Sequence, residues 1–244
     1  MKKRIISCLL LLALLLPVGS AFATTVDTAT DAGQDIAVDR GMVAEEATDN
    51  LLYYRDMPKH WAAHSAGRLG FLDKIVGQQA DNRYYFYPER EITRGEFAIW
   101  LCAVMDIEPT AEGTLYADAD IPRWMCGFVD AVTEEGIVEG EPASRSEITS
   151  YFYPHRPITR IEAIRMLSIA LGVDGHDDNL AGLFHDIDAI PGWGKNNVKH
   201  LSELKIIVGD RGYLHPTRHM TRGEAAELLY KAYKEMRLPH YDYH

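Results

Sequence analysis

Hydrophobic residues recur at steps of three and four along six stretches of the chain, a spacing that places them on one face of an α-helix. Three stretches begin at a tryptophan, and their stripes are Trp61, Ala66, Leu69 and Leu72; Trp124, Phe128, Val129 and Val132; and Trp193, Asn197, Val198, Leu201 and Leu204. Three others follow a Thr-Arg pair, and their apolar positions are Trp100, Leu101 and Val104; Met166, Leu167 and Ala170; and Leu228, Leu229 and Ala232. The pattern predicts an all-α fold built from six helices.

The six predicted helices belong to three copies of one unit. Each copy opens with an aromatic-x-Asp triplet, at 54–56, 116–118 and 184–186, followed by a tryptophan and, sixteen residues later, a glycine. A proline and Thr-Arg-x-Glu complete it, and only the segment between glycine and proline varies in length, as a surface loop does. An internal repeat of this kind predicts helix-loop-helix units that pack on each other. The predicted repeats span 53–110, 111–175 and 176–237.

The Thr-Arg-x-Glu motif has the spacing of a capping box. A threonine at the N-cap accepts a hydrogen bond from the third helical residue, whose glutamate bonds back to the threonine amide. Each cap is expected to contribute ~1 kcal/mol. The predicted structural caps are Thr93 with Glu96, Thr159 with Glu162 and Thr221 with Glu224.

An arginine occupies the first helical position in all three motifs: Arg94, Arg160 and Arg222. The amino-terminal end of a helix carries partial positive charge, so stability alone would favour an acidic residue there. A guanidinium beside free helix amides is, however, a good site for a carboxylate. The repeated arginine therefore predicts three anion sites.

These motifs together resemble the S-layer homology (SLH) family, over about residues 53–236. The family unit carries aromatic-x-Asp, Trp, a glycine after a short apolar run, aromatic-x-Pro and Ile-Thr-Arg-x-Glu. The resemblance implies a pseudo-threefold helical spindle with grooves between neighbouring units. Departures are Gly95, Ile161 and Gly223 where the family favours alanine, Asp73 and Lys205 in place of a glycine that only Gly136 keeps, Leu214 for an aromatic residue, and Met220 for isoleucine.

Family members hold exported proteins on the bacterial envelope, usually through a secondary cell-wall polysaccharide that bears pyruvate ketals. Some relatives in diderm bacteria bind modified peptidoglycan instead. The resemblance implies that the motif arginine contacts the ligand. Candidate ligand-binding residues are therefore Arg94, Arg160 and Arg222, with Trp61, Trp124 and Trp193, Asp56, Asp118 and Asp186, and Gly77, Gly140 and Gly209 around them.

Each candidate also has a structural interpretation. A motif arginine could instead pair with the aspartate of an aromatic-x-Asp triplet and join two repeats. We rank contact with a ligand ahead of this structural interpretation. For the tryptophans we rank core packing ahead of stacking on a sugar, because they begin apolar stripes. The glycines suit a left-handed residue beyond a helix end or in a tight loop, although a bare backbone also lets a sugar approach closely. The aspartates suit helix caps.

The two ends of the chain have compositions unlike the repeats. Residues 1–23 have a basic start, an apolar run and Ala21-Phe22-Ala23, as in a cleaved signal peptide. Residues 24–52 resemble a solvated acidic leader, and 238–244 form a tail. Cleavage would remove three basic residues and no acidic one, taking the formal net charge from −11 to about −14. An exported acidic protein is a poor partner for nucleic acid, and no membrane insertion is expected after cleavage.

Other chemistry is sparse in the sequence. Cys102 and Cys126 are expected to be either a disulfide or two free thiols, since their spacing decides neither. No metal-ligand spacing, nucleophile motif or cofactor fingerprint is present, and the acidic stretch at 174–179 lacks the pattern of a calcium loop. We therefore expect no catalytic residue, metal or cofactor. The predicted function is a noncatalytic, cell-surface anchor, with an adaptor for a protein partner second and an enzyme third.

Overall fold

The structure, a computed structural model, describes residues 50–111, 113–142, 149–172, 180 and 182–237, which lie in one compact unit. The predicted signal peptide, nearly all of the leader, the tail and the acidic stretch at 174–179 lie outside the described residues. Among the described residues no helix has the length and apolar character needed to cross a bilayer.

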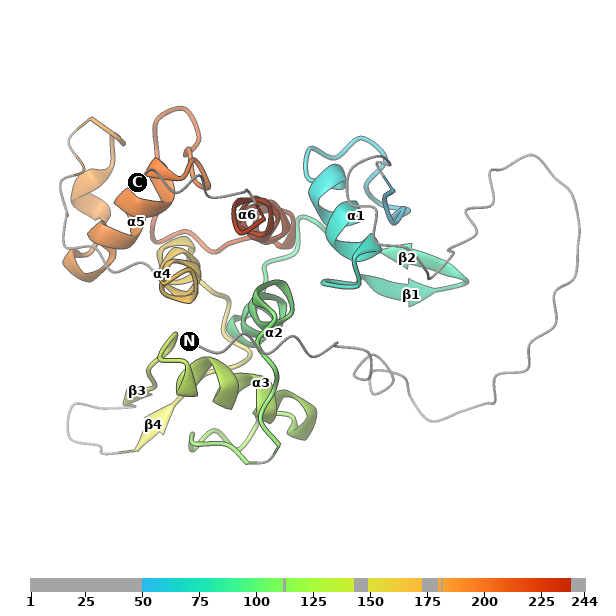
Figure 1. The fold of residues 1–244 in the computed structure, drawn as a ribbon, viewed down its shortest axis with the longest axis horizontal. Coiled ribbons are helices and arrows are strands. Elements are labelled where there is room, and N and C mark those ends of the chain that lie inside the picture. The colour runs from blue at the N-terminus through green and yellow to red at the C-terminus, as the bar shows by residue number, and fades with distance from the viewer. Residues whose placement is uncertain (1–49, 112, 143–148, 173–179, 181, 238–244) are drawn as a thin grey trace, which may run out of the picture. The chain divides into compact units, whose positions relative to one another are not determined.

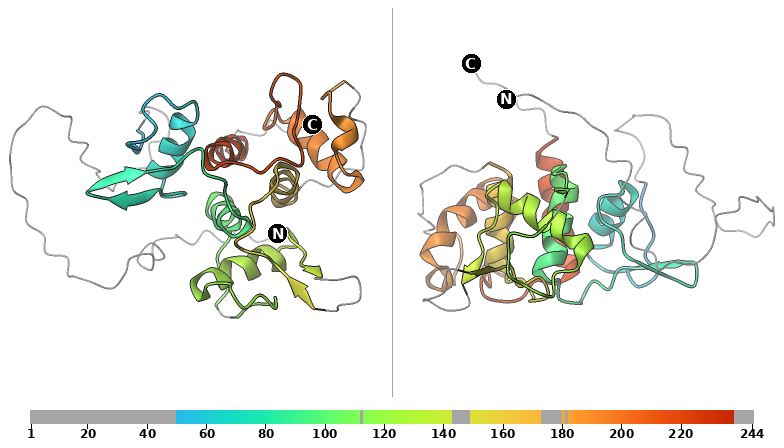
Figure 2. Two further views of the ribbon diagram at one scale, coloured as in Figure 1. Left: turned by 180° about the vertical axis from the view of Figure 1, so that it is seen from behind. Right: turned by 90° about the horizontal axis from the view of Figure 1, so that it is seen from below.

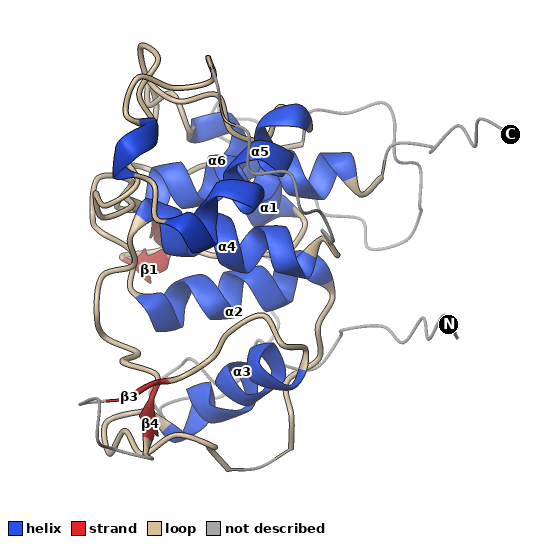
Figure 3. Ribbon diagram, turned by 90° about the vertical axis from the view of Figure 1, so that its left-hand side faces the viewer, coloured by secondary structure: helices blue, strands red, loops and turns tan. Residues whose placement is uncertain are grey.

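Within the described ranges six α-helices form the framework, as the hydrophobic pattern predicts. They are α1 (Ala63–Phe71), α2 (Arg94–Met105), α3 (Arg123–Glu134), α4 (Arg160–Ala170), α5 (Lys195–Glu203) and α6 (Arg222–Glu235). Two short 3₁₀ turns, η2 (Ile187–Ala189) and η3 (Gly192–Gly194), precede α5. The mostly helical fold class is thereby confirmed, as the dominance of helix in Figure 3 shows.

Short antiparallel hairpins occupy the loops of variable length. The first repeat pairs β1 (Gln78–Ala80) with β2 (Arg83–Tyr85), and the second pairs β3 (Glu141–Pro142) with β4 (Ser150–Tyr151). The third repeat has a single bridge between Asp210 and Tyr213. Strands of two or three residues are too short to show a period of two, which is why the hydrophobic pattern did not predict them.

The capped helices α2, α4 and α6 lie side by side at the centre, and the other three surround them (Figures 1 and 2). The outer helix of each repeat packs on the capped helix of the preceding repeat: α3 on α2 and α5 on α4. In the same way α1 packs on α6, so the first repeat closes onto the third. Each repeat is therefore completed by its neighbour.

A closed ring of three backbone hydrogen bonds joins the segments that lead into the capped helices. The Ile92 amide donates to the Met220 carbonyl at 3.0 Å, the Met220 amide to the Ile158 carbonyl at 3.0 Å, and the Ile158 amide to the Ile92 carbonyl at 3.1 Å. All three side chains are buried. Since each segment serves both neighbours equally, the ring gives the unit its pseudo-threefold symmetry.

The size of the residue after a motif arginine is matched to the residue that packs on it from the next repeat. A β-carbon on Gly95 would lie 2.6 Å from the Met125 sulfur, so the small residue on α2 makes room for methionine on α3. The sizes are reversed at the next interface, where a β-carbon on Gly194 would lie 2.8 Å from Ile161 Cδ1. The bulk of Ile161 is thus accommodated at the α4–α5 interface, and its side chain is buried there.

Candidate functional site

The capping glutamates are the centres of three equivalent charge clusters. All three capping boxes are formed, and α2, α4 and α6 begin at the motif arginines, as predicted. Each glutamate accepts a hydrogen bond from an arginine of its own turn: Glu96 from Arg90, Glu162 from Arg156 at 2.8 Å, and Glu224 from Arg218.

Each glutamate also faces the motif arginine of the preceding repeat. Arg94 Nη1 lies 3.8 Å from Glu162 Oε1, and Arg160 Nη1 lies 3.8 Å from Glu224 Oε1. Arg222 closes the cycle, with Nη1 3.4 Å from Glu96 Oε1. Two guanidinium groups therefore share one capping carboxylate at every junction between repeats.

The interpretation of a motif arginine as a clamp to an aromatic-x-Asp aspartate is wrong about the partner. The carboxylate that each arginine meets is the capping glutamate of the next repeat, with Glu141 as an additional neighbour of Arg94 at 3.9 Å. The repeats are joined across their boundaries, but through the capping box itself.

The prediction of free helix amides beside the arginines is also wrong. The Arg94 amide donates to the Arg156 carbonyl at 2.8 Å, and the Gly95 amide donates to the Pro154 carbonyl at 2.9 Å. The first two amides of α4 donate in the same way to the carbonyls of Arg218 and Pro216, in the turn before α6. The first two amides of α6 donate to the carbonyls of Arg90 and Pro88, in the turn before α2. The helix ends therefore bind the adjacent repeat, and only side chains remain for an anion.

The three motif arginines differ in how completely they are satisfied. Arg222 is buried, donates through Nε to the Phe86 carbonyl at 2.8 Å, and lies over the Trp100 ring at 4.6 Å. Arg94 is also buried, but its Nε has no hydrogen-bond partner among the described residues. Arg160 is partly exposed, and its buried Nε likewise lacks a partner among them.

Burial sets the acid-base properties of these arginines. Burial lowers the pKa of Arg222 to about 10, against the opposing effect of Glu96. It also lowers the pKa of Arg94 and Arg160, although Glu162 and Glu224 favour their charged forms. All three guanidinium groups remain charged at neutral pH, and unused donors on a desolvated cation favour an anionic ligand.

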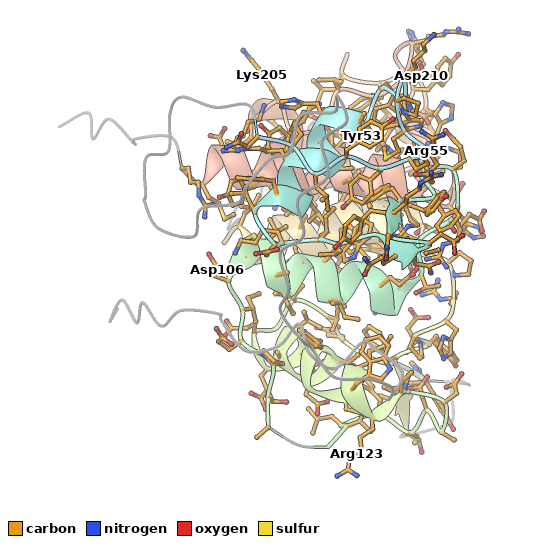
Figure 4. The ribbon with its side chains drawn as sticks, turned by 90° about the vertical axis from the view of Figure 1, so that its right-hand side faces the viewer. Tyr53, Arg55, Asp106, Arg123, Lys205 and Asp210 are labelled. Atoms are coloured by element: carbon orange, nitrogen blue, oxygen red, sulfur yellow. The ribbon has the colours of Figure 1, made fainter. Side chains whose placement is uncertain are left out.

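A groove with a cavity volume of about 280 Å³ lies where Arg160 meets the third repeat. Trp61 of the first repeat lines it together with Gly209, His215, Arg218 and Glu224 of the third. Asp210, at its margin, lies at the end of the unit where the capped helices begin, opposite Asp106 at the end of α2 (Figure 4). All three repeats thus contribute to one concave surface.

The preferred interpretation of the tryptophans as core residues is wrong. Trp61, Trp124 and Trp193 are 59%, 45% and 50% exposed. The buried apolar positions of each predicted stripe begin further along, at Ala66, Val129 and Val198. Trp61 and Trp193 lie just before α1 and α5, so the period of those helices does not place them on a buried face.

The interpretation of Asp56, Asp118 and Asp186 as helix caps is wrong as well. Each carboxylate accepts the amides of two consecutive residues in the later loop of its own repeat. Asp56 binds the amides of Phe86 and Tyr87 at 2.9 and 2.6 Å, Asp118 those of Phe152 and Tyr153 at 2.6 and 2.7 Å, and Asp186 those of Leu214 and His215 at 2.8 and 2.7 Å. The aspartates therefore hold the loop that leads into the capped helix.

The glycines owe their identity to close packing more than to backbone angle. Only Gly209 of the three has a positive φ, +71°, so a left-handed conformation is wrong for Gly77 and Gly140. At Gly140 a β-carbon would lie 2.5 Å from the Tyr116 ring, and at Gly77 it would lie 2.7 Å from the Tyr54 ring. The left-handed residues beyond the outer helices are Asp73, Gly136 and Lys205.

Sequence reasoning missed three functional candidates, Arg90, Arg156 and Arg218. They lie four residues before the motif arginines and recur in every repeat, so the repeat alignment contains the signal that finds them. Their side chains are 46%, 34% and 46% exposed, which makes them the accessible cations of the three clusters.

The remaining candidates for chemistry are limited. Cys102 and Cys126 are both free thiols, and Cys102 is buried. Within the described ranges, no three or more His, Cys, Asp or Glu side chains are grouped so as to hold a metal ion.

Comparison with known proteins identifies the repeats. The S-layer homology domain model matches residues 119–164 and 183–226, the core of the second and third repeats. The first repeat, which is not matched, takes the same part in the hydrogen-bonded ring and the charge clusters as the other two.

Several surface proteins share this region. The chain is 26% identical to the S-layer protein sap of Bacillus anthracis over 186 residues, which is 75% of this chain and 21% of that protein. It is 28% identical to the S-layer protein of Bacillus licheniformis over 179 residues, 72% of this chain and 19% of that protein. An exoglucanase of Acetivibrio thermocellus is 26% identical over 181 residues, 72% of this chain and 16% of that enzyme. The chain therefore spans about a fifth of its relatives' length or less.

Proposed function

Because the chain belongs to the S-layer homology family, we propose that its three repeats form a noncatalytic module that anchors the protein to the cell wall. Family membership and the surface-layer relatives indicate a secreted protein at the cell surface. The proposed ligand is an anionic secondary cell-wall polysaccharide, in the first instance one that carries pyruvate ketals. A ketal presents one carboxylate on a sugar ring, which a guanidinium binds through two parallel hydrogen bonds.

One observation carries the proposal: each junction between repeats places two arginines on one capping glutamate. At the junctions of Glu96 and Glu224 the pairing leaves one unbalanced positive charge among these groups, in a chain whose formal net charge is −11. At Glu162 a second carboxylate, Glu141, also accepts from Arg156 at 2.9 Å, so that junction is balanced. The net negative charge of the protein repels polyanions in general, so an anionic ligand is favoured only where the local charge is positive.

The Arg160 groove is the proposed principal site. Leu214 stands where the first two repeats have Phe86 and Phe152, and among the described residues no aromatic ring faces the Arg160 guanidinium. Arg160, like Arg94, has a buried Nε with no hydrogen-bond partner among the described residues, and it shares Glu224 with the exposed Arg218. Arg94 is a second, more enclosed candidate, whereas the contacts of Arg222 assign it mainly to the core. Several such sites on one polymer would add avidity.

The test compares the retention of three arginine variants on isolated cell walls. Arg160→Met removes the charge and hydrogen-bond donors from the proposed site, and is expected to weaken binding roughly tenfold to a hundredfold. Arg94→Met is expected to have a smaller effect. Arg222→Met is the matched control, since it changes the equivalent residue, whose Nε donates to the Phe86 carbonyl. Circular dichroism checks that all three variants stay helical.

Removal of the ketals from the wall preparation identifies the ligand. Loss of wild-type binding supports the pyruvylated polysaccharide. Binding that survives ketal removal but disappears after protease treatment of the walls identifies a protein partner, and binding that requires intact peptidoglycan identifies that polymer. Equal retention of wild type and Arg160→Met would overturn the arginine-centred site.

A further inference from the structure

A bulky residue with a left-handed backbone precedes the loop proline in every repeat. Tyr87, Tyr153 and His215 have φ values of +56°, +58° and +57°. For residues other than glycine this conformation costs about 1–2 kcal/mol, so glycine or asparagine is the usual choice. A costly conformation retained at three equivalent positions points to a use for the side chain.

The aspartate of the aromatic-x-Asp triplet holds this conformation in place. In each repeat its two carboxylate oxygens accept the amide of the left-handed residue and the amide before it, at 2.6–2.9 Å. These hydrogen bonds, outweighing the effect of burial, lower the pKa of Asp186 and keep it charged. Charge-assisted hydrogen bonds of this length are strong enough to offset the backbone strain.

The turn stacks the left-handed residue on the residue two positions earlier. The ring centroids are 6.0 Å apart for Tyr85 and Tyr87, 5.7 Å for Tyr151 and Tyr153, and 5.7 Å for Tyr213 and His215, with interplanar angles of 20°, 20° and 19°. The residue between them, Phe86, Phe152 or Leu214, is fully buried. Each ring pair is therefore fixed by the core beneath it, while Tyr87 and Tyr213 remain 41% and 43% exposed.

The ring pairs lie next to the arginine clusters. His215 lines the groove that contains Arg160 and Arg218. In the first repeat the carbonyl between the paired rings, that of Phe86, accepts the Arg222 Nε hydrogen bond. In the second repeat the side chain between them, Phe152, lies 5.0 Å from the Arg94 guanidinium. Each cluster thus has a rigid aromatic surface beside it.

We propose that the three ring pairs, Tyr85–Tyr87, Tyr151–Tyr153 and Tyr213–His215, are platforms on which sugar rings of the wall glycan stack while the neighbouring arginines bind its carboxylates. The proposal rests on the proposed function and adds a second kind of contact to it. Flat aromatic faces with little conformational freedom suit the apolar face of a pyranose ring. Three platforms would also select a polymer over a free carboxylate.

Replacing the left-handed residues with glycine removes the rings without opposing the backbone. The triple variant Tyr87→Gly, Tyr153→Gly, His215→Gly is expected to keep its helical content and its melting temperature within a few degrees, because glycine adopts positive φ without strain. Its affinity for purified wall polysaccharide is expected to fall about tenfold. Asparagine at the same positions, which also tolerates this conformation, provides a second variant with the same expected loss.

Two controls separate stacking from other effects. Tyr87→Phe with Tyr153→Phe keeps the rings and removes the hydroxyl groups, and is expected to bind within twofold of wild type. Tyr53→Ala removes an exposed tyrosine outside the ring pairs, labelled in Figure 4, and is expected to bind like wild type.

The outcomes distinguish the two proposals. One combination of results would overturn the platforms and leave the arginine site standing. In it, wild type binds the polysaccharide, Arg160→Met loses binding, and the glycine and asparagine variants bind within twofold of wild type. If wild type fails to bind the polysaccharide at all, the proposed function itself fails. Loss of binding in the glycine and asparagine variants, with folding retained and binding kept in the phenylalanine variant, supports the platforms.

Discussion

The guanidinium of Arg94 lies 3.8 Å from the carboxylate of Glu162, across the boundary between the first and second repeats. The same relationship joins Arg160 to Glu224, and Arg222 to Glu96, where it links the last repeat back to the first. One glutamate therefore caps a helix, fixes an arginine of its own turn and faces an arginine of the neighbouring repeat. The same carboxylate therefore contributes to stability and belongs to the proposed ligand site.

Glu224→Gln is expected to change stability and affinity in opposite directions. Glutamine keeps the capping geometry but removes the charge that Arg160 and Arg218 share. We expect the free energy of unfolding to fall by about 1–3 kcal/mol, because two close guanidinium groups then repel each other. The affinity for an anionic wall polysaccharide should rise severalfold.

Urea denaturation and polysaccharide binding, both at low salt, measure the two effects of Glu224→Gln. Glu134→Gln, which removes an exposed carboxylate from α3, is the charge-matched control and should alter neither quantity by much. A Glu224→Gln protein that binds the anionic polysaccharide more weakly, while remaining folded, would contradict the shared-charge interpretation.

Stability should decline in acid through two capping glutamates, Glu162 and Glu224. Burial on its own raises the pKa of Glu162 and Glu224, but hydrogen bonds from Arg156 and Arg218 outweigh it, and both pKa values lie below the ordinary 4.5. Between the lowered pKa of the folded protein and the ordinary pKa of the unfolded chain, the unfolded chain binds more protons than the folded one. The two glutamates therefore stabilise the fold fully above about pH 4.5, and this stabilisation is lost as the pH falls through the folded pKa. Urea titrations from pH 7 to pH 3 should show this decline, and the double variant Glu162→Gln, Glu224→Gln should show a shallower one.

The two cysteines should differ sharply in reactivity. Burial raises the pKa of Cys102 to about 12, so almost no thiolate forms at pH 8. Cys126 is partly exposed on α3. We expect an alkylating reagent to modify Cys126 at least about a hundredfold faster, a ratio that should disappear in denaturant. Peptide mass spectrometry gives the two rates, and modification of Cys102 as fast as that of Cys126 in the folded protein would contradict its burial.

The parts of the fold that depend on local pattern could be predicted from the sequence. Helices, capping boxes and the repeat itself follow from neighbours a few residues apart. The partner of Arg94 could not be predicted, because it depends on the cyclic order in which repeats pack. The exposure of Trp61 depends on how the turn before α1 meets the third repeat, and the left-handed Tyr87 depends on a carboxylate thirty-one residues earlier. Such features arise only when distant segments meet.

Size complementarity between Ile161 and Gly194 yields a prediction that separates packing from backbone effects. Gly194 has φ −97°, which alanine adopts freely, so Gly194→Ala would stabilise the protein slightly if backbone entropy decided the outcome. The added β-carbon would instead lie 2.8 Å from Ile161 Cδ1, and we expect a loss of about 1–3 kcal/mol in urea denaturation. Shortening the neighbour in Ile161→Val should recover at least half of that loss in the double variant, giving a favourable coupling energy. Gly192→Ala, in the same 3₁₀ turn but with open space around its β-carbon, is the matched control and should leave stability unchanged or slightly higher. Equal losses at both glycines would show that the turn, and not the contact with Ile161, requires glycine.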